Sequence, residues 1–272
     1  MQKDSIWFDE NHYNNESGSM PDFHYHDYYE IYYLFSGERR YLINYDLYDI
    51  RCGDIILIKK NDLHMTKRLE TPFGSNIKIY LTDDAFYSMG ENAERFRECF
   101  KYNHIVFPDN RKEYIKALFE KIRDNYKKDG PFTRQLTVNS VYEILIAIYG
   151  NIFNSISDSP VIPVSENEEI SKAIRYIYDN FNRELSLNDI AGYVNMNPSY
   201  FSRIFKKHTG INLTDYINHI RIKNANIMLI NSSRPVTEIA ANCGFDNQTY
   251  FCKVFRKING CSAREFRKRN VR

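Results

Sequence analysis

The sequence predicts an α+β protein of two domains, in which a β-rich domain with trailing helices precedes an all-α domain. Short apolar runs separated by glycine, which are typical of strands, occupy residues 29–81. Residues 200–210 and 250–260 then carry the same helical pattern twice. A chain of 272 residues is long enough for two domains that each bury a core.

The β-rich segment is predicted to form a sandwich or a small barrel, because it contains several short strands at regular spacing. The predicted strands cover residues 30–35, 40–44, 54–58 and 77–81, and Gly37, Gly53 and Gly74 separate them. Tyrosine and phenylalanine are dense in this segment. Such residues suit a cavity for a small ligand as well as an ordinary core.

Two helices are expected after the strands. The first carries an apolar stripe at helical spacing, formed by Ile115, Leu118, Phe119, Ile122 and Tyr126. The second runs from about Arg134 to Phe153 and is apolar on most sides from Val141 onward. A helix of this kind has to be covered, either by its own domain or by a second copy of the chain. We therefore expect a homodimer, while packing within the domain remains the alternative.

A change in composition and charge divides the chain. Serine, acidic residues and two prolines interrupt the helical patterns at residues 156–169, which predicts a linker between domains at 1–155 and 170–272. Residues 1–169 contain 20 Lys and Arg against 28 Asp and Glu, a net charge of −8, whereas residues 170–272 contain 17 against 7, a net charge of +10. This asymmetry favours nucleic acid as the partner of the second domain.

The chain has no apolar stretch typical of a signal peptide, and no run approaches the roughly 18 apolar residues of a membrane span. We expect a cytoplasmic protein that does not enter a membrane. The cysteines are Cys52, Cys99, Cys243, Cys252 and Cys261. Their odd number, without Cys-x-x-Cys spacing, argues against a disulfide framework and a zinc knuckle. A redox sensor at Cys52 or Cys99 lacks a paired thiol.

The repeat is predicted to form two helix-turn-helix units. Each copy places apolar residues one, four and five positions after a tyrosine, which builds one helix face. These residues are Phe201, Ile204 and Phe205 in the first copy, and Phe251, Val254 and Phe255 in the second. A shorter helical pattern precedes each copy, at residues 187–194 and 236–243. The aromatic residues could stack on single-stranded bases, but their periodicity favours core packing.

Turn signals stand before the second helix of each unit. Asn197 and Pro198 are favoured residues for a helix start. In the second unit, Gly244 is expected in a left-handed turn and Asp246 as the N-cap. The two units are joined by residues 213–229, a helical pattern about 25 Å long at 1.5 Å per residue. Because major-groove faces repeat about every 34 Å, both recognition helices can enter adjacent grooves.

Residues 170–269 resemble the DNA-binding domain of the AraC/XylS transcription regulators. The resemblance rests on Ile190-Ala191, Ile239-Ala240, Gly244-Phe245 and the Phe-Lys-Lys and Phe-Arg-Lys ends of the two repeats. Ser262 stands where the family usually has proline. The resemblance implies a transcription regulator that binds double-stranded promoter DNA. An activator is expected, and a repressor remains the alternative.

The resemblance also implies which residues contact DNA. Base-facing positions match Ser199, Ser202 and Arg203 in the first unit, and Gln248, Thr249 and Lys253 in the second. Arg203 suits guanine and Gln248 suits adenine. Phosphate contacts are expected at Lys206, Lys207, Arg256 and Lys257. These four cations also stand at helix C-termini, where they compensate for the helix dipole, and the two roles are compatible.

Near the N-terminus, the chain resembles the cupin superfamily in a His-x-His pair, a glutamate and a later histidine. These residues are His24, His26, Glu30 and His64. The resemblance implies a cupin-like β-barrel in which they converge on a metal. If His24 and His26 share a strand, both point inward, and their chemistry suits Zn, Fe, Mn or Ni. Lys59 and Asn61 replace the usual proline and glycine of the second cupin motif.

Sensory domains of AraC-type regulators often keep this motif without a known metal, so a divalent metal and a structural or ligand-contacting role both remain open. The resemblance suggests a small polar effector, often a sugar or related metabolite. The residues expected to line its pocket are His24, His26, Glu30, Tyr32 and His64. A register change of one residue would turn these side chains to the other face of the strand.

The sequence therefore predicts a regulator whose promoter binding responds to an effector, and not an enzyme. The alternative is a metal-dependent cupin enzyme fused to a DNA-targeting domain. The histidine and glutamate set alone suggests it, because no further acid, base or nucleophile signature accompanies that set.

Overall fold

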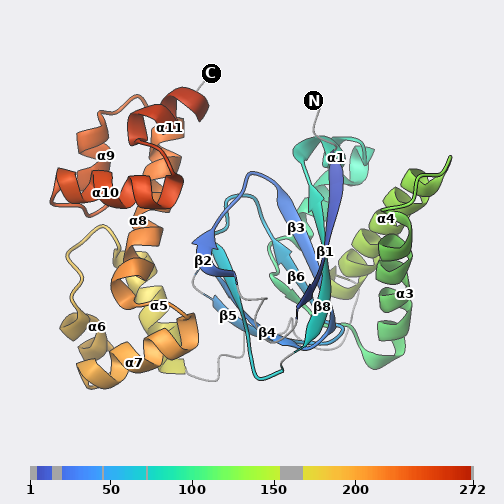
Figure 1. The fold of residues 1–272 in the computed structure, drawn as a ribbon, viewed down its shortest axis with the longest axis horizontal. Helices are drawn as coiled ribbons and strands as arrows, with labels where there is room; N and C mark the ends of the chain where they lie inside the picture. The colour runs from blue at the N-terminus through green and yellow to red at the C-terminus, as the bar shows by residue number, and fades with distance from the viewer. Residues whose placement is uncertain (1–4, 14–19, 45, 72, 154–167, 271–272) are drawn as a thin grey trace. The chain divides into compact units, whose positions relative to one another are not determined.

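The structure, a computed structural model, describes residues 5–13, 20–44, 46–71, 73–153 and 168–270 (Figure 1). It divides into two compact units, residues 1–43 with 47–165, and residues 166–272 with 44–46. The first unit is rich in strands and the second is helical, which confirms the predicted fold class. The linker predicted at 156–169 lies outside the described residues except for 168 and 169, which are already helical. The domain bounds 1–155 and 170–272 stay predictions.

Two antiparallel sheets form the β part of the first unit. In spatial order, the five-stranded sheet contains β1 (Ile6–Tyr13), β8 (Gly74–Leu81), β3 (Tyr29–Ser36), β6 (Ile55–Ile58) and β9 (His104–Ile105). The four-stranded sheet contains β2 (Met20–His24), β7 (His64–Arg68), β4 (Glu38–Ile43) and β5 (Asp46–Arg51). The four predicted strands are confirmed as β3, β4, β6 and β8. The other five strands were not predicted.

The two faces of β3 have different surroundings. Tyr29, Ile31 and Tyr33 belong to the large core that the five-stranded sheet shares with the helices. Tyr32 and Leu34 belong to a second buried cluster, together with residues of β4, β5 and β6. Because side chains alternate along a strand, Glu30 lies on the same face as Tyr32. Both therefore face the space between the two sheets, which resolves the one-residue ambiguity of the sequence.

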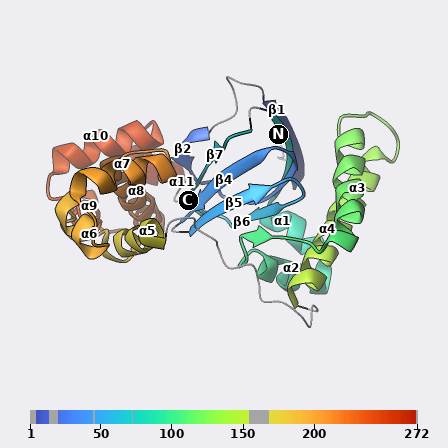
Figure 2. The same ribbon diagram turned by 90° about the horizontal axis from the view of Figure 1, so that it is seen from below.

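The helices of the first unit are α1 (Asp83–Tyr87), α2 (Ala93–Cys99), α3 (Asp109–Asn125) and α4 (Thr133–Phe153), with a 3₁₀ turn at Gly90–Asn92. Figure 2 shows α3 and α4 running side by side along the unit. Both predicted helices are confirmed. Ile115, Leu118, Phe119 and Ile122 of the predicted stripe are buried, whereas Tyr126 follows the last helical residue and is partly buried.

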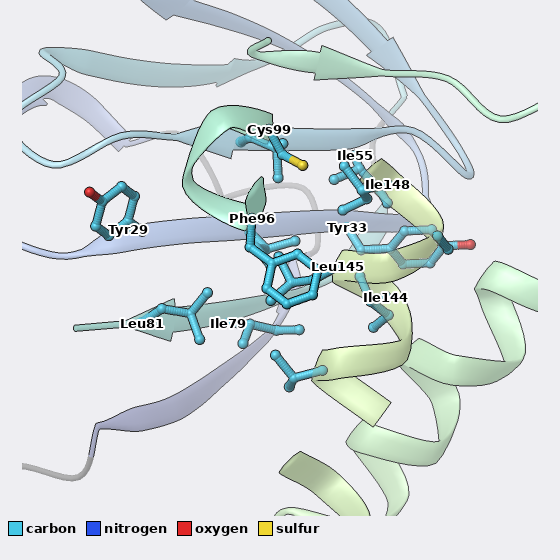
Figure 3. Packing of buried hydrophobic residues seen from close by; sticks show 14 of the residues in the cluster. Tyr29, Tyr33, Ile55, Ile79, Leu81, Phe96, Cys99, Ile144, Leu145 and Ile148 are labelled. Atoms are coloured by element: carbon cyan, nitrogen blue, oxygen red, sulfur yellow. The ribbon is translucent and has the colours of Figure 1, made fainter. Parts of the chain in front are cut away.

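Helix α4 supplies a large share of the core. Ile144, Leu145 and Ile148 are fully buried and pack near Tyr33, Ile55 and Ile79 of the five-stranded sheet (Figure 3). Burying each such side chain contributes roughly 1.5–3 kcal/mol. Within the described ranges, α4 is also the one helix long and apolar enough to cross a membrane. Its packing against the sheet is that of a core helix.

Over its described residues 168–270, the second unit consists of helices and the loops between them. They are α5 (Glu168–Asn180), α6 (Leu187–Tyr193), α7 (Pro198–Thr209), α8 (Leu213–Asn231), α9 (Val236–Asn242), α10 (Gln248–Asn259) and α11 (Ala263–Asn270). The pairs α6–α7 and α9–α10 are the two predicted helix-turn-helix units. Asn197 caps α7 and accepts hydrogen bonds from the Ser199 and Tyr200 amides, as expected.

The N-cap of α10 differs from the prediction. Gly244 does adopt a left-handed conformation, with φ of 82°. The capping side chain, however, belongs to Asn247, whose Oδ1 accepts a hydrogen bond from the Tyr250 amide at 2.9 Å. The turn after Gly244 uses one residue more than expected, so Asp246 lies within the turn and not at its end.

Candidate nucleic-acid interface and barrel site

The two recognition helices, α7 and α10, are held down by the same pair of aromatic residues. Phe201 and Phe205 in α7, and Phe251 and Phe255 in α10, are fully buried. Phe251 and Phe255 pack with Ile222 and Leu229 of α8 in one apolar cluster. The phenylalanines of the repeat are thus core residues and not a stacking platform, whereas Tyr200 and Tyr250 are exposed. Their burial fixes which side of each helix is presented outward.

The predicted DNA-contacting residues lie on the outward sides of both helices. Ser199, Arg203, Lys206 and Lys207 of α7 are exposed, and Ser202 is half-buried. Gln248, Thr249, Lys253, Arg256 and Lys257 of α10 are all exposed. The guanidinium of Arg203 lies 5.5 Å from the ring centroid of Tyr200. Lys257 Nζ lies 3.5 Å from Asp215 Oδ1, an exposed ion pair of the kind that contributes little to stability.

Helix α8 packs against both helix-turn-helix units. Its N-terminal half reaches the first unit through Tyr216, whose ring lies edge-on at 5.4 Å from that of Phe205. Its C-terminal half carries Ile222, Ala225 and Leu229, which belong to the core of the second. Helix α8 therefore contributes side chains to the cores of both helix-turn-helix units, in addition to connecting them.

Three histidines converge in the first unit. The ring centroids of His24 and His64 are 4.1 Å apart, and those of His26 and His64 are 4.9 Å apart. One ligand nitrogen of each lies within 4.8 Å of the other two. Glu30 adjoins them, because its Oε2 lies 3.2 Å from His26 Nε2. The four residues of the cupin-like set are therefore brought together.

One detail of that prediction is wrong. Strand β2 ends at His24, and His26 lies in the bend before β3. The two histidines therefore do not share a face through strand pleating. Instead, His24 reaches His64 because the two are partners in the β2–β7 ladder, and the bend returns His26 to the same place. Asn61, which stands where the family usually has glycine, adopts a left-handed φ of 64°, a conformation that glycine and asparagine adopt more readily than other residues.

Burial, hydrogen bonds and neighbouring charges shift the pKa values of two residues in this cluster. Burial opposes ionisation of Glu30, but the His26 hydrogen bond and the charge of Lys78 outweigh it and lower its pKa to about 2. Burial also lowers the pKa of His64 to about 3, so its ring is neutral. His64 Nδ1 donates to the Asp62 carbonyl at 2.8 Å, which leaves the lone pair on Nε2.

The Nε2 atom of His64 is buried and has no hydrogen-bond partner among the described residues. His26 is flanked by two acceptors, the Tyr28 carbonyl at 2.8 Å from Nδ1 and the Glu30 carboxylate at Nε2. An imidazolium satisfies both acceptors, and so does a neutral ring whose Nε2 binds a metal that Glu30 also ligates. The donor set fits a divalent metal of the zinc, iron, manganese or nickel type.

Other polar residues around this cluster escaped the sequence analysis. Tyr32 is opposite Lys78 in the β3–β8 ladder, and both are buried. Arg39 is buried as well and donates from Nε to Thr66 Oγ1 at 3.0 Å. No local signal marks Lys78, because a lysine between two isoleucines in β8 is also the pattern of a strand with one solvent-exposed face. The space between the sheets therefore presents charged groups of both signs.

The chain matches two family models. Residues 190–269 match a helix-turn-helix domain, and residues 11–74 match the AraC-like ligand binding domain. The chain belongs to the AraC family of transcription regulators. The two models fall on the two units that the structure separates.

Several curated proteins are similar to this regulator. It is 36% identical over 105 residues to the regulatory protein PocR of Salmonella typhimurium, a match that covers 39% of this chain and 35% of PocR. It is 26% identical to the Msm operon regulatory protein of Streptococcus mutans, over 89% of this chain and 84% of that protein. It is also 26% identical to the arabinose operon regulatory protein of Escherichia coli, over 80% and 72% of the two chains. These relatives are regulators, and this AraC-family chain is a regulator and not an enzyme.

Proposed function

We propose that this AraC-family regulator binds one bipartite promoter site with α7 and α10 in adjacent major grooves, and that a small polar effector held between the two sheets modulates this binding. The observation that carries the proposal is the repeated layout of the second unit. Both helices bury two phenylalanines and turn exposed donors outward. The charge of +10 on residues 170–272 supplies attraction to phosphate.

The reading positions divide into two sets. Ser199, Ser202 and Arg203 face bases in one half-element, and Gln248, Thr249 and Lys253 face bases in the other. Lys206, Lys207, Arg256 and Lys257 contact phosphates further along each helix. Because the base-facing residues differ between the copies while the buried ones agree, the two half-elements have different sequences.

The effector is a sugar or a related polyhydroxylated metabolite. Two relatives are named for the Msm operon and the arabinose operon, and each match spans at least 80% of this chain. The inward-facing groups of the first unit suit hydroxyl recognition, because they include both donors and acceptors. Glu30, Tyr32, His24, His26 and His64 are the proposed contacts. Lys78 and Arg39 extend this set.

A divalent metal is proposed at the same cluster, with His24, His26, Glu30 and His64 as its ligands. Two observations favour it: three imidazole nitrogens lie within 4.8 Å of one another, and the buried His64 Nε2 has no hydrogen bond among the described residues. A bound metal would supply a Lewis acid that can attract the hydroxyl groups of a sugar. This chain's residues then orient the effector through the surrounding tyrosine and lysine.

The chain forms a homodimer through a helix-pair surface, defined as Tyr114 of α3 with Ile146 and Phe153 of α4. All three side chains are exposed. Ile146 and Phe153 are one heptad apart and lie on one side of α4, as in a helix-pairing seam. The Tyr114 hydroxyl lies 3.4 Å from a Glu143 carboxylate oxygen, which keeps the two helices in register. A dimer in the cytoplasm, near its promoter, is the working form.

Footprinting tests the proposed function. Full-length protein is incubated with DNA from upstream of its own and adjacent genes, with and without a panel of sugars and related metabolites. We expect protection of two adjacent major grooves per protomer, and a change in affinity with one compound. Protection of one groove contradicts the bipartite mode, and a sugar-insensitive footprint contradicts the effector class.

A further inference from the structure

A cluster of contacts inside the second unit ties one helix-turn-helix to the other. Its centre is Arg221, a half-buried residue of α8. Arg221 Nε donates to the Phe181 carbonyl at 2.8 Å, and Nη2 donates to the Arg183 carbonyl at 2.8 Å. Both carbonyls lie in the loop between α5 and α6, where the first helix-turn-helix begins. The same guanidinium lies 5.6 Å from the ring centroid of Phe245, in the turn of the second.

The turn of the second helix-turn-helix lies against this loop. A Cβ atom on Gly244 would come within 2.6 Å of the Phe181 carbonyl oxygen and 3.0 Å of Arg221 Nε. A glycine is therefore required here for close approach as well as for its positive φ. Three segments meet at one point: the α5–α6 loop, the middle of α8 and the turn that leads into α10.

Helix α8 adds two contacts on the same stripe. Asn218, three positions before Arg221, is buried and donates from Nδ2 to the Tyr250 hydroxyl at 2.8 Å. Asp215, three positions earlier again, pairs with Lys257. Residues three apart lie on one side of a helix. Since Tyr250 and Lys257 stand near opposite ends of α10, the stripe contacts that recognition helix along its length.

We infer that Arg221, supported by Asn218, is a positioning residue that fixes the separation and angle of α7 and α10. It thereby sets the number of base pairs that this regulator accepts between its two half-elements. A planar guanidinium that donates to two carbonyls allows one arrangement of its partners, unlike a single hydrogen bond. The inference rests on the proposed two-groove binding mode and assigns neither residue a contact with DNA.

The test is the dependence of DNA affinity on half-element spacing. Full-length protein is titrated with two duplexes, the footprinted site and the same site with two base pairs inserted between its half-elements. The insertion rotates one half-element by about 70° and displaces it by about 7 Å. We expect the wild-type protein to bind the inserted site about 100-fold more weakly, because only one unit can then engage.

Arg221→Met keeps the aliphatic stem and removes the donors. We expect this variant to bind the site with native spacing about tenfold more weakly. The second helix-turn-helix is then held less rigidly, so its effective concentration at its half-element is lower. The penalty for the insertion should fall from about 100-fold to below about tenfold, since loosened units can follow the displaced groove. A variant that merely lowers stability would weaken binding to both duplexes by the same factor.

Arg267→Met is the matched control. Arg267 donates from Nε to the Leu229 carbonyl at 3.3 Å and from Nη2 to the Arg234 carbonyl at 2.6 Å. Arg267 thus also donates to two carbonyls. Its contact connects α11 to the end of α8 and the loop that follows, and it does not connect the two helix-turn-helix units. We expect Arg267→Met to keep the wild-type spacing penalty.

A second variant, Asn218→Ala, covers the case in which Arg221→Met does not fold, as judged by thermal unfolding. It should shift the spacing penalty in the same direction by a smaller factor. If the folded variants lose as much affinity on the inserted site as the wild-type protein does, the positioning role is overturned. Wild-type protein that binds both spacings equally instead overturns the two-groove mode, and the inference with it, so the two failures are distinguishable.

Discussion

At the scale of single residues, Arg203 is the side chain best suited to read a base. It is exposed on α7 and can donate two hydrogen bonds to guanine. We expect Arg203→Ala to weaken binding to the specific site by about 1–3 kcal/mol and to relax discrimination at one base pair. Titrations against a set of single-base variants of the site measure both effects.

The control for Arg203 is Lys207→Ala, which removes an exposed cation from the same helix. A phosphate contact carries no sequence information, so its loss should weaken all duplexes alike and reduce the salt slope by about one. Equal losses on specific and random DNA for Arg203→Ala would contradict its role as a base reader.

His64 is the residue that decides the metal question. Its Nε2 is buried and has no hydrogen bond among the described residues, so a metal would complete its coordination. We expect protein purified without chelator to hold about one divalent metal per chain, as measured by elemental analysis, and His64→Ala to lose it. His104→Ala is the control, because His104 pairs with Asp54 at 3.0 Å and lies outside the three-histidine cluster. A metal-free wild-type protein refutes the site.

Residue type and spacing identified these residues as candidates, and their roles in binding stay predictions. His24, His26, Glu30 and His64 were grouped by resemblance, and the structure brings them together. The bend that carries His26 could not be predicted, because nothing local marks the end of β2. Lys78 and Arg39 were missed for a related reason: their role depends on which strands face each other, and tertiary contacts alone determine this.

At the scale of elements, the turn before α10 depends on Gly244. Its φ is 82°, and a Cβ there would lie 2.6 Å from the Phe181 carbonyl oxygen. Gly260 ends α10 with a φ of 69°, but a Cβ there would meet nothing within 4 Å. A substitution at Gly260 therefore introduces backbone strain alone, whereas a substitution at Gly244 introduces backbone strain and a steric clash.

We expect Gly260→Ala to lower the free energy of unfolding by about 1 kcal/mol, which is the cost of a left-handed alanine. Gly244→Ala should cost more, about 2–4 kcal/mol, because the added methyl group also displaces the α5–α6 loop. Urea unfolding followed by circular dichroism measures both values. Similar losses in the free energy of unfolding for the two variants would mean that the α5–α6 loop moves away from the added methyl group at no cost in free energy.

Helices proved easier to predict than strands, and their side-chain environment explains this. Helices α5, α7 and α10 keep a strong apolar period, because each buries one stripe of side chains against the core beside it. Strand β1 carries Asp9, Glu10, Asn11 and His12, and β7 reads His-Met-Thr-Lys-Arg. Neither has the apolar alternation of an ordinary strand. One is an edge strand and the other faces a polar interior, so the usual signal is missing from both.

At the scale of the whole molecule, the net charges of the two halves favour different contacts. Residues 170–272 carry +10 and are suited to DNA, whereas residues 1–169 carry −8 and would be repelled by it. The acidic half is therefore not expected to contact DNA. That half also carries the helix-pair surface of Tyr114, Ile146 and Phe153.

Ile146 tests that surface. Its side chain is 59% exposed. It lines a surface hollow with a volume of about 450 Å³, together with Tyr114 and Glu143. In a symmetric dimer, Ile146→Glu buries two unpaired carboxylates and brings them near Glu143, so we expect the dissociation constant to rise by about 100-fold or more. Phe73→Glu is the control, since Phe73 is 61% exposed and lies outside the helix pair. Sedimentation velocity over a range of concentrations measures both variants. Because the proposed binding mode needs only one protomer's two helices for each bipartite element, monomeric Ile146→Glu protein should still protect a single element. Loss of that protection would tie DNA binding to the dimer itself.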